Sequence, residues 1–281
     1  MKRMNLVALL LCLAMLCACG AKQPNNASAP EAPQQEQKEK TSDPVYSYED
    51  ILASKQFTDE ESGKLYASYS YRVPMMRIAN ADNLTDDALA IAQRNTDAFN
   101  AQMQKILDDA VAFGEENTGE PTEHFFSMPA ADEKELTVLQ AGQILTVWAD
   151  GYFHSGGAHP YVYNDSYTFD LALGQFIDPT QISDDPEAFR VKTAALLVAQ
   201  AEGLGEDYTS GYWNDYEEII AHWNEAAVRF DRNGMTVIFS AYELGPYAMG
   251  PVELFLTYEE LADAIGEGGL AQLGASDANT P

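Results

Sequence analysis

The chain has 281 residues, a formal net charge of −28 and three cysteines. All three cysteines lie in the first nineteen residues, which excludes disulfides, thiolate metal sites and cysteine nucleophiles from the sequence that follows. Residues 44–281 carry 40 Asp and Glu against 11 Lys and Arg, so the acidity belongs to this part of the chain. Such a charge repels nucleic acid and anionic lipid and favours cationic partners, although it also promotes solubility by itself.

The first eighteen residues have the pattern of an export signal. Two basic residues precede an uncharged apolar run from Leu6 to Leu16, which is shorter than the roughly 20 residues that a transmembrane helix needs. The tetrapeptide LCAC at 16–19 resembles the lipobox of bacterial lipoproteins, in which the signal is cut before the cysteine and the thiol carries a diacylglycerol. The resemblance implies that residues 1–18 are removed and that a lipid on Cys19 anchors the protein to the extracytoplasmic side of the cell membrane. The alternative is an ordinary secretory signal with incidental cysteines.

Composition divides the rest of the chain into three parts. Residues 19–44 are rich in Gln, Ala, Pro and Asn and lack aromatic side chains, which predicts a disordered tether. Residues 266–281 are Gly-rich and have no periodicity, which predicts a flexible tail. Residues 45–265 are long enough to bury a sizeable core, either as one domain or as two small ones fused closely. We expect one domain with an N-terminal half, 45–115, and a C-terminal half, 116–265.

The N-terminal half predicts one strand and one long helix. In residues 64–73, apolar and aromatic side chains occupy every second position, and two serines lie on the opposite face. This alternation is typical of a half-buried strand, and we expect Pro74 to end it. Thr85 is placed to cap a helix over 86–112, whose apolar residues recur every three or four positions. We interpret the resulting apolar face as core.

The C-terminal half predicts short strands and further helices. Aromatic and β-branched runs, separated by turns at the pairs Asp150-Gly151, Gly156-Gly157 and Leu173-Gly174, predict strands at 124–126, 136–139, 144–148, 161–171, 235–240 and 254–256. Helical spacing predicts helices over 186–202, 214–229 and 258–265. Because strict β-α-β alternation is missing, the predicted fold class is α+β, with an antiparallel sheet packed against the long N-terminal helix and two to three further helices.

The segment His154–His159, with the sequence HSGGAH, is the one candidate for catalysis or metal binding. Its two histidines could ligate a metal together with Asp150 or Asp165, and Ser155 could act as a nucleophile. The chain has no HExxH, GxSxG or phosphate-binding glycine motif, so we interpret the glycine pair as a tight turn and the histidines as half-buried structural residues. We therefore expect no enzyme, no metal and no cofactor, and a cell-envelope hydrolase using this segment is the alternative.

Aromatic side chains offer a second kind of candidate site. Tyr208, Tyr212 and Trp213 lie together in a segment that we expect to be an exposed loop. Such rigid side chains provide contact area and hydrogen bonds at a low entropy cost, so they suit recognition of proteins or glycans. The alternative is that they are ordinary core residues.

Two segments of the C-terminal half resemble a known family. The sequence GGAH at 156–159, followed by YTFDL at 167–171, and the sequence FSAYELGPYAMGP at 239–251, which leads to Tyr258, resemble the extracytoplasmic domain of the anti-sigma factor RsiV. That domain of unknown function also accompanies a bacterial peptidoglycan deacetylase. The resemblance covers about residues 60–265 and implies structural or binding roles for the motif residues, which are Gly156, Gly157, His159, Tyr242, Pro246, Tyr247, Gly250, Pro251 and Tyr258.

The resemblance implies an exported domain that binds a partner and does not catalyse a reaction. In RsiV the domain senses lysozyme, a strongly basic protein, and an acidic domain suits a cationic ligand of that kind. The printed sequence shows no sigma-binding segment, transmembrane helix or deacetylase domain, so lysozyme binding does not carry over. We expect a membrane-anchored lipoprotein that binds or senses a basic protein or a cell-wall component such as peptidoglycan. A purely structural envelope role is a third possibility.

Overall fold

The structure is a computed structural model, and it describes residues 40–117, 129–155, 159–206 and 210–275. Several sequence predictions fall outside these ranges, namely the signal peptide, the tether before residue 40, the strand at 124–126, and the individual residues Cys19, Gly156, Gly157 and Tyr208. Across the described ranges, no helix combines the length and the apolar character that crossing a bilayer requires.

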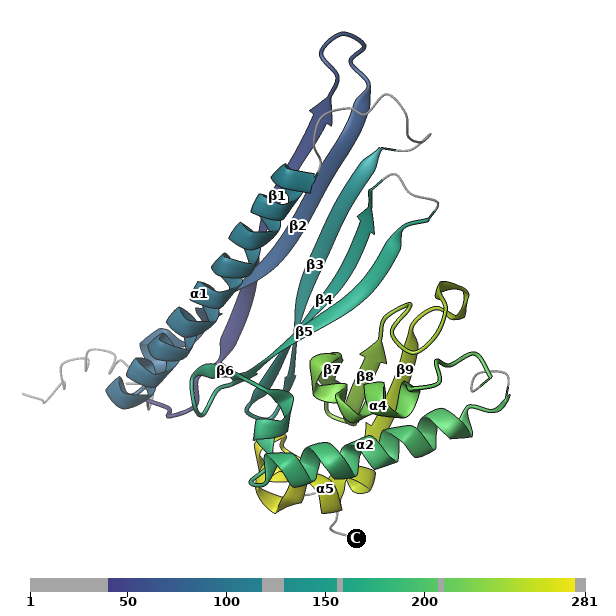
Figure 1. Ribbon diagram of the computed structural model, residues 1–281. Coiled ribbons are helices and arrows are strands. Elements are labelled where there is room, and N and C mark those ends of the chain that lie inside the picture. The colour runs from purple at the N-terminus through teal and green to yellow at the C-terminus, as the bar shows by residue number, and fades with distance from the viewer. Residues whose placement is uncertain (1–39, 118–128, 156–158, 207–209, 276–281) are drawn as a thin grey trace, which may run out of the picture. The chain divides into compact units, whose positions relative to one another are not determined.

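A six-stranded sheet forms the larger part of the fold. Its strands follow chain order across the sheet, and they are β1 (Tyr46–Thr58), β2 (Leu65–Ile78), β3 (Ala130–Ala141), β4 (Ile144–His154), β5 (Tyr161–Asp170) and β6 (Gln175–Ile177). Neighbouring strands are antiparallel except β2 and β3, which are parallel. The helix α1 (Asp86–Asn117) connects these two, because parallel neighbours require a crossover. It lies along one face of the sheet (Figure 1).

The long helix forms for the reasons that its sequence indicated. The Thr85 hydroxyl accepts a hydrogen bond from the backbone N–H of Ala88 at 3.3 Å, and acidic residues occupy the first turn, where the helix dipole favours them. Its buried face includes Phe99, Met103 and Ile106, which pack against apolar side chains of the sheet. The predicted helix is confirmed and continues to Asn117.

Strand β2 continues past Pro74, where we expected it to end. Its pairing with β3 stops at Arg72, so Pro74 lies in a part of β2 that is paired with β1 alone and can tolerate the missing N–H. Further along, the Asn100 side chain of α1 accepts from the Met76 backbone N–H at 2.7 Å and donates to the Met76 carbonyl at 3.0 Å. An amide side chain thus takes the place of a neighbouring strand at this point.

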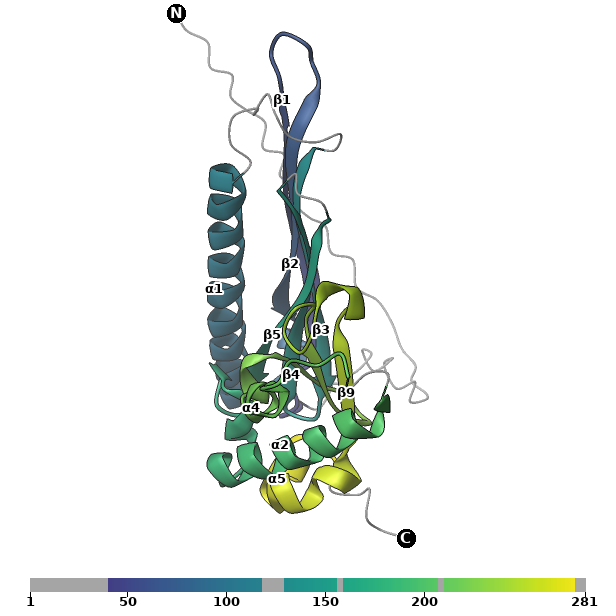
Figure 2. The same cartoon turned by 45° about the vertical axis from the view of Figure 1, so that its right-hand side comes forward.

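Residues 186–272 add a small sheet and helices on the other face of the large sheet (Figure 2). The elements are α2 (Pro186–Gly203), α4 (Tyr216–Ala221), β7 (Ala227–Phe230), β8 (Gly234–Phe239), β9 (Val252–Thr257) and α5 (Tyr258–Gln272), with the antiparallel order β7-β8-β9 in the sheet. Their side chains form a second core around Phe189, Trp223 and Phe230. The structure is therefore α+β, as predicted from the sequence.

Two hydroxyl groups connect β7 to the large sheet. The backbone N–H of Val228 donates to the Ser166 hydroxyl at 2.7 Å, and that of Phe230 donates to the Thr146 hydroxyl at 3.2 Å. Val228 and Phe230 are two residues apart, so both N–H groups leave the same edge of the strand. The two hydroxyls accept hydrogen bonds from N–H groups at a strand edge that would otherwise be free to pair with another strand.

The helix predicted over 214–229 is wrong beyond residue 221. There α4 ends, and the carbonyl of Ala221 accepts a hydrogen bond from the Arg190 guanidinium at 2.7 Å. Residues 227–230 instead pair with β8 across a turn at Asn233-Gly234. Val228 and Phe230 are fully buried in this strand, and tertiary packing outweighs the helical spacing that the sequence suggested.

Three further expectations differ from the structure. The pair Asp150-Gly151 lies inside β4 and not in a turn. Strand β1 was not predicted, because most of its side chains are exposed and their alternation is weak. The segment from 266 begins as helix and not as a tail: α5 bends at Gly266, where φ is 78°, and continues to Gln272, beside the buried Leu273.

Candidate functional site

The structure brings together three of the motif residues, His159, Tyr242 and Tyr247, which we call the aromatic cluster. The rings of His159 and Tyr247 stack with their centroids 3.8 Å apart. The Tyr242 ring lies 5.5 Å from that of Tyr247, and its hydroxyl is 3.3 Å from Nε2 of His159. Tyr242 is 49% exposed, so the cluster presents aromatic surface to solvent.

Hydrogen bonds to the main chain hold the aromatic cluster in place. The Tyr247 hydroxyl donates to the Pro160 carbonyl at 2.9 Å, which joins the β8–β9 connection to the start of β5. From the other side, the Trp213 indole donates to the carbonyl of Tyr242 at 3.0 Å, and the Trp213 backbone N–H donates to the carbonyl of Leu244 at 2.8 Å. Trp213 is itself 40% exposed and extends the aromatic surface.

Tyr242 adopts a backbone conformation that a bulky residue rarely takes. Its φ is 77°, and among the described residues it is the one non-glycine residue with positive φ. Such a conformation costs of order 1 to 3 kcal/mol, and strain of this kind concentrates at functional sites. Local hydrogen bonds maintain it, since Glu243 N–H donates to the Ser240 carbonyl and the Glu243 carboxylate accepts from Ser240 N–H.

The other described motif residues lie outside the aromatic cluster, at the ends of secondary-structure elements or in the turns beside them. Tyr258 is buried at the start of α5, and its hydroxyl donates to the Asp231 carbonyl at 2.5 Å. Gly250 takes a φ of 75° where the short helix Tyr247–Met249 ends, and its neighbours in the motif, Pro246 and Pro251, are exposed.

The candidate loop at 208–213 likewise contains one exposed and one buried aromatic residue among those that the structure describes. Trp213 is exposed, as expected, and lies beside the aromatic cluster. Tyr212 is buried, and its ring packs 5.2 Å from that of Tyr216. The prediction of an exposed loop therefore holds for Trp213 and is wrong for Tyr212.

The two histidines of the 154–159 segment have different surroundings. His154 is 5% exposed at the end of β4, with Nδ1 3.3 Å from the Pro129 carbonyl. His159 is exposed and belongs to the aromatic cluster. Within the part of the chain that the structure describes, no group of three His, Cys, Asp or Glu residues is arranged to hold a metal ion.

The segment that contains most of the aromatic cluster is rich in carboxylates. Residues 193–281 contain 15 Asp and Glu against two basic residues, Arg229 and Arg232. Glu243 follows Tyr242 in the chain, and Asp215 lies two residues after Trp213; both are exposed. Exposed rings and carboxylates therefore follow one another in this part of the chain. The Glu243 carboxylate also accepts from the Ser240 backbone N–H, and partial burial of this carboxylate raises its pKa.

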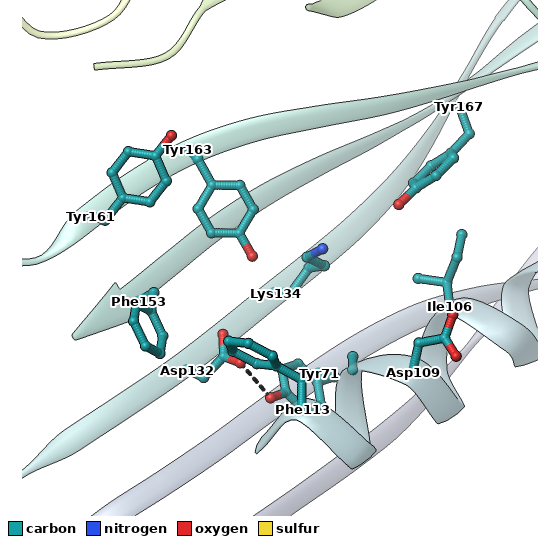
Figure 3. Close-up of a pocket in the computed structure, with 11 residues that line it drawn as sticks. Tyr71, Ile106, Asp109, Phe113, Asp132, Lys134, Phe153, Tyr161, Tyr163 and Tyr167 are labelled. Atoms are coloured by element: carbon teal, nitrogen blue, oxygen red, sulfur yellow. Dashed lines mark hydrogen bonds between the residues drawn. The ribbon is translucent and has the colours of Figure 1, made fainter. Parts of the chain in front are cut away.

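A second candidate site is a pocket between α1 and the large sheet, with a volume of about 400 Å³ (Figure 3). Strands β2 to β5 form its floor, and Ile106, Asp109 and Ala110 of α1 form one wall. Six aromatic side chains line it, namely Tyr71, Phe113, Phe153, Tyr161, Tyr163 and Tyr167. Its size and apolar lining are typical of small-molecule sites.

Polar groups in this pocket gather around Asp132, which is only 5% exposed. The Tyr71 hydroxyl donates to one oxygen of the Asp132 carboxylate at 2.7 Å, as Figure 3 shows. Burial raises the pKa of Asp132, while the Tyr71 hydrogen bond and the charge of Lys134 act in the opposite direction. Burial and the charge of Asp132 together raise the pKa of the Tyr163 hydroxyl to about 12. The Lys134 ammonium lies 5.3 Å from the centre of the Tyr163 ring.

Sequence reasoning missed this pocket. The strand predicted at 136–139 began too late, so Asp132 and Lys134 were not placed on a strand. The alternation of Asp132, Lys134 and Leu136 would have placed them on one face of β3. The pocket itself depends on where α1 crosses that face, and no local sequence pattern specifies this.

Comparison with known proteins identifies the fold. Residues 201–259 match the profile of DUF3298, a protein family of unknown function, and this segment includes Tyr242 and Tyr247. No curated protein matches the chain. The fold is similar to that of a DUF3298 member from Bacteroides fragilis, with 16% identity and a TM-score of 0.61 over 84% of this chain and 99% of that one. A DUF3298 protein from Pseudomonas aeruginosa is similar at 15% identity and a TM-score of 0.47, over 82% and 98%. This chain thus shares the fold of the Bacteroides fragilis protein and contains a segment that matches its family.

Proposed function

We propose that the protein is a membrane-anchored lipoprotein whose folded domain binds a basic protein at the cell envelope without catalysing a reaction. The aromatic cluster and Trp213 are the contact surface in this proposal. The lipobox at 16–19 supports the anchor, and the motif resemblance to the RsiV extracytoplasmic domain supports a binding role.

The observation that carries the proposal is the combination of exposed rings and carboxylates at one place. Aromatic faces attract Lys and Arg side chains through their π-electrons, and nearby carboxylates add charge-assisted hydrogen bonds. The rings are stacked and hydrogen-bonded before any partner arrives, so binding loses little side-chain entropy. A strained Tyr242 is consistent with selection for this surface, because stability alone would favour glycine at φ 77°.

Binding is tested by titrating the purified domain with hen egg-white lysozyme as a basic probe protein. Isothermal titration calorimetry at low and at moderate salt concentration should show an affinity that falls as the salt concentration increases, because the attraction is between opposite charges. Soluble peptidoglycan fragments serve as the second probe, since a cell-wall component is the alternative partner. An absence of binding both to lysozyme and to the peptidoglycan fragments, at every salt concentration, contradicts the proposal.

Two variants test whether the aromatic cluster is the contact surface. Tyr242→Gly and Tyr247→Leu should each weaken lysozyme binding by about tenfold or more, as expected for central aromatic contacts. The matched control is Tyr66→Ala, which removes a tyrosine from β2, on the other sheet. If Tyr66→Ala weakens binding as much as the cluster variants do, the cluster is not the contact surface.

The anchor is tested separately in cells. The full-length chain should label with a radioactive fatty acid and fractionate with membranes, and Cys19→Ser should lose both properties. Cys17→Ser is the control, because it keeps the cysteine at the expected cleavage site. Release of the wild-type protein without label contradicts the anchor and leaves the binding proposal intact.

A further inference from the structure

We propose that the pocket between α1 and the large sheet is a second, separate binding site for a small organic amine: an aromatic or aliphatic body that carries one ammonium group. The body would occupy the aromatic part of the pocket, and the ammonium would face Asp132. The pocket shares no lining residue with the aromatic cluster, and this proposal does not depend on the basic partner proposed for that cluster.

The shape of the pocket favours a small molecule. A volume of about 400 Å³ lies within the range for small-molecule sites and has room for a two-ring compound. Its walls come from secondary structure, because α1 provides one side and β2 to β5 provide the floor. In Figure 3 the lining rings are spread along the pocket, with Phe153 and Tyr163 toward one end and Tyr167 toward the other, on either side of Lys134.

The charge of the pocket favours a cation. Two carboxylates line it, the buried Asp132 and the exposed Asp109, together with one ammonium, that of Lys134. Asp109 already forms a 2.6 Å ion pair with Lys105, so Asp132 is the carboxylate that would anchor a ligand cation. A second ammonium between the rings would gain both the negative faces of the aromatic groups and a carboxylate in a poorly solvated place. A ligand carboxylate would instead meet Asp132 at close range.

Asp132 remains available as an anchor despite its bond to Tyr71. A carboxylate has two oxygens with several acceptor positions, and Tyr71 donates to Oδ2. Lys134 is the competing cation, but it projects over the face of the Tyr163 ring at 5.3 Å. Removal of the Lys134 charge should therefore strengthen the binding of an external amine.

Three compounds with one indole ring and a two-carbon chain test the charge preference. Tryptamine ends in an ammonium, tryptophol in a hydroxyl and indole-3-propionate in a carboxylate, and each would be titrated calorimetrically into the intact domain at neutral pH. Tryptamine should bind about tenfold or more tightly than indole-3-propionate, with tryptophol between them, because one charge-assisted hydrogen bond has roughly that effect. Equal affinities, or tighter binding of the carboxylate, would overturn the proposal.

Variants show whether the pocket is the site. Asp132→Asn keeps an acceptor for the Tyr71 hydroxyl, and it should remove most of the preference for tryptamine while tryptophol binding persists. Glu133→Gln is the matched control, since it makes the same change at the next residue, which is exposed and points to the opposite face of the sheet. Lys134→Met should increase tryptamine affinity by a few-fold.

A final variant blocks the pocket without altering its charge. Ala110→Phe places a ring into the space from α1 and should reduce binding of all three compounds, with circular dichroism confirming that the domain is folded. Unchanged tryptamine binding in folded Ala110→Phe would place the amine elsewhere and refute the assignment. An absence of tryptamine binding to the wild-type domain would refute it as well, whatever the outcome of the lysozyme titration.

Discussion

Tyr71 and Asp132, which are 61 residues apart in the chain, are joined by a 2.7 Å hydrogen bond between adjacent parallel strands. The Tyr71 hydroxyl is the donor, and both residues are buried. The bond compensates for part of the cost of placing a carboxylate between α1 and the sheet. The cost of burying the Asp132 carboxylate can be measured from the pH dependence of the free energy of unfolding.

Burial raises the pKa of Asp132 above its unfolded value, so the folded protein holds the Asp132 proton more tightly than the unfolded chain. The contribution of Asp132 to the free energy of unfolding should therefore be most favourable below about pH 4 and decrease as pH rises from the unfolded pKa through the folded one. Asp132→Asn lacks this dependence. Urea unfolding of both proteins at several pH values should show wild-type stability falling relative to Asp132→Asn as pH rises. A difference that does not vary with pH would contradict the assignment.

Tyr71→Phe removes the hydroxyl donor and leaves the ring in place. We expect a loss of roughly 1 to 3 kcal/mol in the free energy of unfolding at neutral pH, because a buried carboxylate loses its hydrogen bond. The pKa of Asp132 should rise further, since the Tyr71 bond lowers it. NMR titration of the Asp132 carboxyl carbon measures this, and Tyr66→Phe on the same strand is the control.

Tyr242 allows a test of backbone strain. Because its φ is 77°, Tyr242→Gly should be more stable than Tyr242→Ala by about 1 kcal/mol, although both lose the same ring. Thermal unfolding compares the two variants. Equal stabilities would mean that the loop relaxes and that Tyr242 stores no strain in the folded protein.

Gly151 should resist substitution although it lies inside a strand. A side-chain carbon at this position would collide with the ring of Tyr163 on the neighbouring strand, so Gly151→Ala should destabilise the protein by roughly 1 to 3 kcal/mol. Gly203→Ala is the control, because the space around Gly203 is open at the end of α2 and alanine favours helix there. Adding Tyr163→Ala to Gly151→Ala should recover part of the loss, and a full loss in the double variant would point to another cause.

Thr146 should contribute to the attachment of the small sheet. Thr146→Val preserves the shape of the side chain but leaves the buried N–H of Phe230 without its 3.2 Å acceptor, so we expect a loss of roughly 1 to 3 kcal/mol. Thr137→Val, at an exposed position of β3, should change stability by less than about 0.5 kcal/mol. Hydrogen exchange of the Phe230 amide, faster in Thr146→Val than in wild type, would confirm the local cause.

The sequence alone identified the features that depend on neighbouring residues. The helix from residue 86 was predictable because its cap, acidic first turn and apolar face all lie in one continuous segment. Helix α2 and strands β8 and β9 were predictable for the same reason, and so was the mixed fold class. The motif that carries Tyr242 and Tyr247 also drew attention to a segment that the structure places at the surface.

Tertiary structure decided the features that depend on distant partners. Residues 227–230 form a strand because β8 and the hydroxyls of Thr146 and Ser166 satisfy their backbone, which local helical spacing cannot indicate. The stack of His159 on Tyr247 joins residues 88 positions apart, and the pocket around Asp132 exists because α1 crosses the sheet above it. Periodicity shows which face of an element is apolar. Which other element covers that face is fixed by the free energy of the whole packed chain.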